Sequence, residues 1–250
     1  MPTAIAGEHP LTLYLDKREL VTLMTLGQSP EMLAIGYLRN QRIVRAADEL
    51  AAVQVDWETD SCAITTVHLA QGRSCWEVGE LEAKMGKKTV TTGCGQGTVY
   101  GDLMEEIDDI QLPAQARLSE ATLYAVLDHA RKQESIYKQA GAVHGCALCD
   151  ADGNILTFVE DVGRHNAVDA IAGEMWIRGW GGADKLFYTT GRLTSEMVIK
   201  CAQMGIPFLL SRSGLTQMGY ELAQRVGMTM IGRCQGKHYL LFTGMERFSK

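Results

Sequence analysis

The pattern of apolar and polar residues at the start of the chain predicts two paired strands followed by a helix. Residues 11–15 alternate with a period of two, residues 16–18 supply a turn, and residues 20–25 form a second apolar run. This order is typical of a β-hairpin. Ser29 followed by Pro30 indicates a helix start, with Ser29 as the N-cap and Pro30 at the first helical position.

The pattern then continues with further strands up to a glycine-rich stretch. Residues 53–57 and 63–69 alternate like half-buried strands, and residues 87–92 are rich in β-branched side chains. The acidic stretch 105–109, closed by Pro113, is the best candidate for a linker. We therefore expect two domains, a small α+β domain at 1–112 and a larger domain at 113–250.

Beyond this linker, strand patterns and helix patterns alternate. The expected helices lie at 118–131, with Ser119 as a possible cap, around one apolar face at 168–176, at 194–204 after a Thr194 cap, and at 215–226. The expected strands lie at 142–148, 155–160, 185–190, 207–211, 228–233 and 239–242. Such alternation predicts a mostly parallel sheet with helices on its faces.

Composition places the chain among soluble globular proteins. It has 250 residues, of which 46% are hydrophobic and 22% charged, and 24 basic against 30 acidic residues give a net charge of −6. The acidic balance argues against broad binding to nucleic acids, which requires a basic face. We find neither a membrane-spanning apolar run nor a secretory signal, so we expect a cytoplasmic protein without membrane contact.

Among the seven cysteines, Cys94 has the most unusual surroundings. An odd cysteine count in a chain of this size does not indicate a disulfide framework, so we expect reduced thiols. Gly93, Gly95 and Gly97 leave Cys94 unshielded and let backbone amides turn toward a thiolate. An exposed thiol on such a loop suits a carrier that meets first a donor and then an acceptor. The alternative is a tight turn that holds an inert cysteine.

His144, Cys146 and Cys149 form a second cysteine motif. The three residues are compatible with a redox dithiol or with three ligands of a zinc site. Equally, the segment is apolar enough to be a core strand with buried free cysteines. Because no further ligand pair and no deaminase-type glutamate accompany the motif, we expect no stoichiometric metal. Cys201 is expected to serve packing.

The densest polar cluster, residues 160–166 with Asp169 after it, lies where a strand ends and a helix begins. Ligands of open α/β sheets bind at such positions, and helix N-termini attract anions. We expect Arg164 and His165 to contact a phosphate while Glu160 or Asp161 orients them. The alternative is a helix cap with a solvated ion pair.

Two later loops repeat this arrangement of strand, turn and helix start. Residues 191–196 contain Arg192, and residues 211–214 contain Arg212 between two serines. Each loop alone is a weak signal, because such turns are common before a helix. Three basic or hydroxylic loops at equivalent strand ends together predict one phosphate-bearing ligand.

The residues just described resemble the FdhD family of formate dehydrogenase accessory sulfur carriers. The block from Glu160 to Asp169, with the sequence EDVGRHNAVD, is similar to the family signature. Further similar segments run nearly end to end: Glu8-His-Pro with the strand to Leu15, residues 29–38, Thr92-Gly-Cys-Gly95, Gly145 after His144, residues 191–197 and residues 211–214.

The resemblance implies a three-layer α/β/α C-terminal domain resembling cytidine deaminases, without their zinc signature, and a smaller N-terminal α+β domain. It also implies sulfur transfer, in which Cys94 takes sulfur from a cysteine desulfurase as a persulfide. The sulfur then passes to the molybdenum bis-guanine-dinucleotide cofactor before that cofactor enters formate dehydrogenase. The implied cofactor contacts are Arg164, His165, Asn166, Arg192, Leu210, Ser211, Arg212, Ser213, Gly214 and Leu215. Members of the family pair as homodimers.

The sequence departs from the family pattern at its candidate carrier loop. Cys94 matches the first cysteine of a Cys-Gly-x-Cys-Gly loop, whereas Gly97 replaces the second. Cys149 is not a feature of the family. The basic Arg212 is not one either, because in relatives the loop that corresponds to residues 210–215 is a cofactor contact and is small and apolar. Two interpretations follow: a sulfurtransferase-like carrier that uses one thiol, or a chaperone that binds the cofactor without transferring sulfur.

Overall fold

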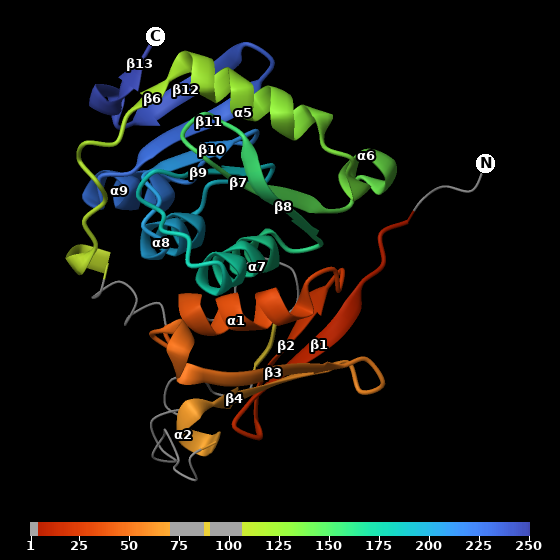
Figure 1. The fold of residues 1–250 in the computed structure, drawn as a ribbon. Coiled ribbons are helices and arrows are strands. Elements are labelled where there is room, and N and C mark those ends of the chain that lie inside the picture. Colours follow the sequence, from red (N-terminus) through yellow and green to blue (C-terminus); the bar gives the residue numbers. More distant parts are fainter. Residues whose placement is uncertain (1–4, 71–87, 91–106) are drawn as a thin grey trace.

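The chain folds into a mixed α/β structure with two main sheets (Figure 1). The structure is a computed structural model and describes residues 5–70, 88–90 and 107–250. The N-terminal sheet has the strand order β3-β4-β1-β2-β5, and the C-terminal sheet has the order β12-β11-β10-β9-β7-β8. A further pair, β13 with β6, lies near the C-terminus.

The predicted hairpin is confirmed at the centre of the N-terminal sheet. β1 (His9–Leu15) pairs antiparallel with β2 (Arg18–Thr25), and alternate side chains of both strands are buried. The outer elements are η1 (Ala47–Glu49), β3 (Leu50–Asp56), β4 (Ser61–Thr66), α2 (Val67–Ala70) and β5 (Lys88–Val90). β5 runs parallel to β2.

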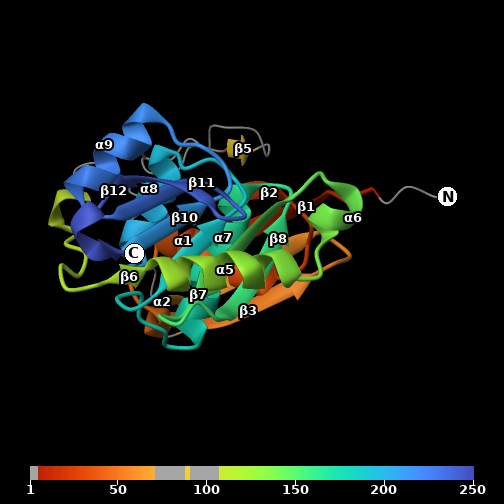
Figure 2. The ribbon, with the colours of Figure 1, turned by 90° about the horizontal axis from the view of Figure 1, so that it is seen from above.

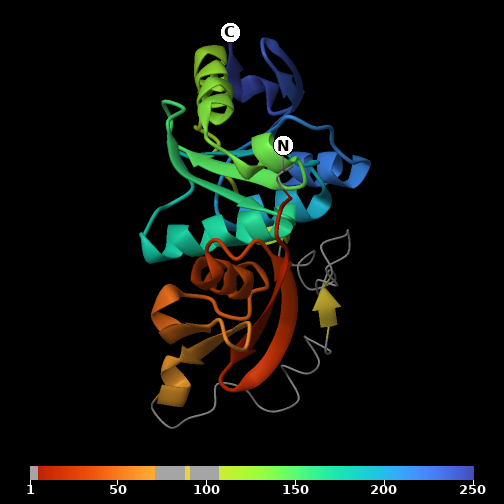
Figure 3. The ribbon, with the colours of Figure 1, turned by 90° about the vertical axis from the view of Figure 1, so that its right-hand side faces the viewer.

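The predicted helix after Ser29 is also confirmed, as α1 (Pro30–Asn40). Ser29 is its N-cap residue and Pro30 its first residue, although the Ser29 side chain makes no capping hydrogen bond. α1 covers one face of the N-terminal sheet and lies against α7 on its other side (Figures 1 and 3).

The C-terminal sheet is mixed, so the prediction of a mostly parallel sheet was wrong. Only β9 with β10 and β10 with β11 pair in parallel, and the other pairings are antiparallel. A hairpin, β7 with β8, lies at one edge and another, β11 with β12, at the other, and a hairpin reverses strand direction. The strands are β7 (His144–Cys149), β8 (Ile155–Asp161), β9 (Leu186–Thr189), β10 (Phe208–Ser211), β11 (Thr229–Gln235) and β12 (His238–Thr243).

Helices cover both faces of the C-terminal sheet, which gives three layers. α7 (Arg164–Ile177) and α8 (Ser195–Gln203) lie on the face toward α1, while α5 (Glu120–Lys132) crosses the opposite face (Figures 1 and 2). The remaining elements are η2 (Ile107–Asp109), β6 (Leu118–Ser119), α6 (Ile136–Ala140), α9 (Gln217–Arg225), η3 (Met245–Arg247) and β13 (Phe248–Ser249). The helix caps predicted at Ser119 and Thr194 are the observed N-cap residues, and Ser119 accepts from the backbone N–H of Thr122.

α7 is buried on nearly all sides rather than on one apolar face as predicted. It lies between the C-terminal sheet and α1 (Figure 3). The two helices approach closely because both carry glycine at the crossing. A Cβ on Gly36 would lie 1.7 Å from the carbonyl oxygen of Asp169, and a Cβ on Gly173 would lie 2.0 Å from that of Met32.

The acidic stretch predicted as a linker contributes to the core. Ile107 and Leu112 are both buried in the cluster that also contains residues of β1, α1, α7 and α8. The boundary at residue 112 stays a prediction. Within the described ranges, no helix combines the length and apolar character that a membrane span requires.

Candidate functional site

Three loops at one end of the C-terminal sheet meet around Gly191. The Arg164 side chain passes so close that a Cβ on Gly191 would lie 2.9 Å from Arg164 Cδ and 3.4 Å from His144 Nδ1. Backbone and hydroxyl bonds join Thr190 to Gly145, at 2.9 Å and 3.0 Å. The loop after β8, the start of β7 and the loop after β9 therefore form one surface.

The loop after β10 is fastened to the loop after β9. Leu193 donates its N–H to the carbonyl of Gly214, and Thr216 donates to the carbonyl of Leu193, both at 3.0 Å. The Ser211 hydroxyl donates to the Gly191 carbonyl at 2.6 Å and accepts from the N–H of Ser213 at 2.8 Å. The structure thus brings together all three loops that the sequence predicts to act jointly.

Basic side chains gather where these loops meet. Arg164 and His165 are buried, His144 is partly buried and Arg192 is exposed. Burial lowers the pKa of His144, and the positive charges of Arg164 and Arg192 lower it further. Because like charges crowd here, an anion would relieve their repulsion.

Three buried nitrogens of this cluster make no hydrogen bond of good geometry among the described residues: Arg164 Nε and both ring nitrogens of His165, of which only Nε2 has an acid beside it. Buried donors and acceptors normally have partners, so orphaned atoms indicate a place for a ligand or water. His165 Nε2 lies 2.9 Å from Glu196 Oε2. Burial lowers the pKa of His165, although Glu196 opposes that shift, so the ring is neutral at neutral pH. The arrangement leaves Nδ1 and Arg164 Nε for an incoming group.

Neither acid expected to orient Arg164 and His165 bonds to their side chains, so the expectation was wrong as a direct contact. Glu160 accepts from the N–H groups of Ile136 at 2.6 Å and Tyr137 at 3.0 Å, at the start of α6. Asp161 accepts from N-terminal residues and from its own turn. Glu196, in the first turn of α8, is the acid beside His165.

A buried ion pair lies one turn farther along α7. Lys200 of α8 donates to both carboxylate oxygens of Asp169, at 2.8 Å and 2.7 Å, and Asn40 of α1 donates to the same carboxylate at 2.7 Å. Burial raises the pKa of Asp169, while Lys200 and Asn40 counter that shift. This group links α1, α7 and α8 beneath the basic cluster.

A cavity of about 270 Å³ opens on the α5 side of the same strand ends. The Arg212 guanidinium lies over the Tyr137 ring, 6.0 Å from its centroid, at the wall of this cavity. The lining combines aromatic rings with basic and acidic groups: Arg131, Tyr137, Lys138, Phe158, Glu160, Tyr188, Thr190, Arg212, Cys234 and others. Such a lining can hold a flat polar ligand that bears negative charge.

A search for related proteins places the chain in a family. The model of the FdhD/NarQ family matches residues 6–249. The chain belongs to the FdhD/NarQ family. It is 27% identical to the sulfur carrier protein FdhD of Listeria monocytogenes, with 99% of this chain and 92% of that protein covered. It is also 27% identical to the sulfur carrier protein FdhD of Bacillus subtilis, with 96% and 88% covered.

A solved structure has the same fold as this FdhD/NarQ family member. It is the crystal structure of a protein from Desulfotalea psychrophila described as a formate dehydrogenase accessory protein. The TM-score is 0.77 at 27% sequence identity, and the match covers 99% of this chain and 92% of that one.

The predicted cofactor contacts of this FdhD/NarQ chain differ in what their side chains do. Leu210 is buried in the core on the α5 face, and the hydroxyl of Ser211 joins two loops. Asn166 donates to Asp161 and to the Met24 carbonyl. Arg164, His165 and Arg192 belong to the basic cluster, and Arg212 lines the cavity. Ser213, Gly214 and Leu215 lie on the partly exposed loop between β10 and α9.

Cys146 and Cys149 do not form a dithiol or share a metal site. Cys146 packs in the core on the α7 face, whereas Cys149 packs in the core on the α5 face. The side chains of a strand alternate between its two sides, so residues three positions apart point to opposite faces. Among the described residues, no cluster of three or more His, Cys, Asp and Glu side chains has metal-binding geometry. The motif is therefore part of β7 and its packing.

Cys94 lies outside the described residues, as does Cys75. The five other cysteines are all buried and free: Cys62, Cys146, Cys149, Cys201 and Cys234. Burial raises the pKa of every one of them, to about 12 for Cys62, Cys146, Cys149 and Cys234 and well above the usual value for Cys201. None of these thiols suits nucleophilic chemistry at neutral pH.

Sequence reasoning missed several residues that shape the site. Thr25 and Asn40 reach it from the N-terminal sheet and from α1, and their long-range bonds leave no local signal in the sequence. Glu196 is part of a motif that the sequence did reveal, yet its contact with His165 depends on how α8 packs on α7. Tyr137 and Lys138 of α6 line the cavity together with Tyr188 of β9, although the β7–β8 hairpin separates α6 from β9 in the sequence.

Proposed function

We propose that this chain is a sulfur carrier for the maturation of formate dehydrogenase and that Cys94 is its carrier residue. The observation that carries the proposal is membership of the FdhD/NarQ family together with similarity to sulfur carrier proteins over nearly the whole length. The burial and raised pKa of the five described thiols support it, because they leave Cys75 and Cys94 as the remaining candidates.

In the proposed loading step, the Cys94 thiolate attacks the terminal sulfur of a persulfide on a cysteine desulfurase. The S–S bond of that persulfide breaks, the desulfurase thiolate leaves with the bonding pair, and Cys94 gains one sulfur atom. In delivery, the S–S bond of the Cys94 persulfide breaks with its electron pair on Cys94. The transferred sulfur takes two electrons from the reduced molybdenum of the substrate cofactor and becomes sulfide.

The register of the N-terminal sheet supports delivery at the Arg164 turn. β5 pairs parallel with β2 so that Val90, its last residue, lies opposite Leu23. Two residues later, Thr25 bonds to Asp161 beside that turn. Cys94 follows Val90 by four residues in the sequence, and four residues span at most about 14 Å.

We infer that the substrate is the molybdenum bis-guanine-dinucleotide cofactor. Its phosphates would suit the guanidinium groups of Arg164 and Arg192, beside the neutral His165 ring. Its flat guanine rings would suit the cavity where Arg212 lies over Tyr137. The layered C-terminal sheet is compatible with the expected deaminase-like architecture, used here as a crevice without a metal of its own.

Three macromolecular partners follow from this proposal: a cysteine desulfurase, formate dehydrogenase and a second copy of the chain. The alternative is a chaperone that binds the cofactor without transferring sulfur, which the replacement of a second loop cysteine by Gly97 favours. One thiol is sufficient to carry a persulfide, so we favour the carrier.

The test is intact-mass measurement after incubation with a cysteine desulfurase and cysteine. The carrier gains about 32 Da, the mass of one sulfur atom, and Cys94→Ala does not. Cys75→Ala is the matched control and gains the sulfur like the wild type. A wild-type chain that binds GDP, a stand-in for the cofactor ends, but never gains sulfur would support the chaperone instead.

A further inference from the structure

One buried carboxylate joins the end of β2 to the turn that begins α7. Asp161 is 4% exposed. The Thr25 hydroxyl donates to it, and the backbone N–H of Leu26 donates at 3.1 Å. From its own side, the N–H of Gly163 donates at 3.0 Å and the side-chain amide of Asn166 at 2.8 Å.

Asn166 makes the connection double. Its amide nitrogen, besides donating to Asp161, donates to the backbone carbonyl of Met24 at 2.7 Å. The last residues of β2 therefore offer a donor to Asp161 and an acceptor to Asn166. We call Thr25, Asp161 and Asn166 the Asp161 clasp.

Holding α1 against α7 does not require this clasp. The close crossing of Gly36 and Gly173, the shared apolar core and the Asn40–Asp169 bond already join the two halves. A buried carboxylate is costly to desolvate, and burial raises the pKa of Asp161 although its hydrogen bonds counter that shift. The distinctive consequence of the Asp161 clasp is that it holds the end of β2 against the turn that begins α7.

Both ends of the clasp adjoin groups of the proposed function. On one side, β2 carries β5, the last described strand before Cys94 in the sequence. On the other side, the turn between Asp161 and Asn166 presents Arg164 and His165, whose buried atoms lack partners among the described residues. Remote positioning of this kind affects rate strongly, because small displacements of reacting groups are costly.

We propose that Thr25 and Asp161 are positioning residues for sulfur delivery: they fix the β2–β5 strand pair against the turn that holds the cofactor. This inference rests on the proposed function and adds that its two steps, loading and delivery, have different structural requirements. Loading of Cys94 occurs on a separate protein, the desulfurase, and does not need the clasp. Delivery needs both sides of the clasp in register.

The test uses Thr25→Val, which keeps the shape of the side chain and removes the hydroxyl donor. Loading is followed by the mass gained from desulfurase and cysteine. Delivery is followed by loss of that mass when the molybdenum bis-guanine-dinucleotide cofactor is added. We expect loading within about twofold of the wild type, and delivery slower by about tenfold or more.

Two matched variants separate positioning from general destabilisation. Thr25→Ser keeps the hydroxyl and restores most of the delivery rate. Thr22→Val applies the same substitution to the same strand and removes a bond to the Thr12 hydroxyl, at 2.9 Å, that is unrelated to Asp161. Delivery by Thr22→Val equals that of the wild type.

Delivery by Thr25→Val at the wild-type rate overturns the inference, as does an equal loss of loading and delivery. A wild-type chain that neither loads nor delivers sulfur refutes the proposed function itself, whatever the variants do, and this inference with it. If Thr25→Val does not fold, Asp161→Asn, of nearly the same volume, is measured instead and is expected to lose delivery alone. Failure of both variants to fold makes the clasp a folding element and also overturns the inference.

Discussion

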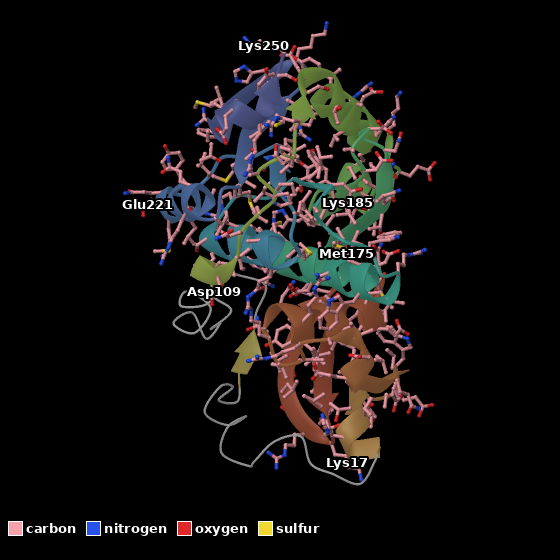
Figure 4. All side chains as sticks on the ribbon, turned by 60° about the vertical axis from the view of Figure 1, so that its left-hand side comes forward. Lys17, Asp109, Met175, Lys185, Glu221 and Lys250 are labelled. Carbon is pink, nitrogen blue, oxygen red and sulfur yellow. The ribbon has the colours of Figure 1, made fainter. Side chains whose placement is uncertain are left out.

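The two sheets differ in the polar side chains that they bury. Among residues 5–70, the buried polar side chains are Thr25, Asn40 and Thr66, none of which is ionisable. Among residues 107–250, buried ionisable groups are concentrated on α7 and its neighbours: Glu160, Asp161, Arg164, His165, Asp169 and Lys200. In Figure 4, α7, marked by Met175, lies between the N-terminal and C-terminal halves.

Two of the three buried neutral side chains of the N-terminal half hydrogen-bond to charged groups of the C-terminal half. Thr25 bonds to Asp161, and Asn40 bonds to Asp169. Thr66 instead bonds within its own sheet, to Asp16. Because buried charges are costly, their concentration on α7 and the segments beside it indicates that this region has a task beyond packing. The N-terminal half supplies uncharged partners that satisfy those charges.

The largest effect is expected where this difference is greatest, at the buried ion pair. Lys200→Met leaves the Asp169 carboxylate, which is 0% exposed, without its counter-charge. Removing one member of a buried pair costs about 3–5 kcal/mol of the free energy of unfolding. Urea denaturation followed by circular dichroism measures the loss.

Two controls define that result. The double variant Asp169→Asn with Lys200→Met recovers a large part of the loss, because no uncompensated charge remains. Lys132→Met removes an exposed partner of Asp128, at 2.5 Å, and leaves the urea midpoint unchanged. Equal loss from Lys132→Met and Lys200→Met would contradict the contrast between buried and exposed charges.

The glycine crossing tests the apolar part of the same boundary. Gly36→Ala places a Cβ 1.7 Å from the Asp169 carbonyl oxygen, so α1 and α7 must separate. Overpacking of this kind costs about 2–3 kcal/mol of unfolding free energy. Gly181→Ala is the control, because its Cβ meets no atom within 4 Å. A Gly36→Ala chain as stable as Gly181→Ala would mean that the helices do not cross there.

Sequence patterns predicted the elements of this fold well and its sheet pairing less well. The hairpin at β1 and β2 and the Ser29–Pro30 helix start were correct because turn and cap residues act locally. The mixed direction of the C-terminal strands was missed, since a strand's apolar pattern does not encode its direction. α7 was expected to have one apolar face, and the polar residues of its first turns gave no sign that β2, α1 and α8 would meet them.

The candidate site was predictable in its loops and not in its partners. Arg164, His165 and Arg192 could be found because basic residues followed Gly turns at strand ends. The clasp by Thr25 and the approach of Glu196 depend on contacts between distant segments, which periodicity cannot reveal. Cys146 and Cys149 looked like a motif because spacing alone does not say that a strand sends them to opposite faces.

A smaller effect is expected on ligand binding at the basic cluster. Arg164→Ala removes a charged donor whose Nε has no partner among the described residues, so the folded chain loses little and the ligand loses a contact. A hydrogen bond to a charged group contributes about 1.5–3 kcal/mol, so calorimetry should find GDP bound roughly tenfold more weakly or worse. Arg178→Ala, at the other end of α7, is the control and leaves the affinity unchanged. Unchanged affinity in Arg164→Ala would remove the cluster from the proposed site.

The smallest effect is a pH dependence of stability that arises from the buried His165 imidazole. Burial lowers the pKa of His165 below 6.5, so between that folded value and 6.5 the unfolded chain binds more protons than the folded one. The free energy of unfolding therefore falls as pH drops below about 6.5, by about 1.4 kcal/mol for each unit by which the pKa is lowered, and levels off below the folded pKa. Urea midpoints between about pH 7.5 and pH 5.5 measure this loss.

His165→Gln removes the contribution of this imidazole to the pH dependence, whereas His238→Gln, on the exposed end of β12, retains the wild-type pH dependence. A wild-type slope in His165→Gln would show that folding does not lower the pKa of this imidazole and would contradict its burial beside Glu196 as a neutral ring.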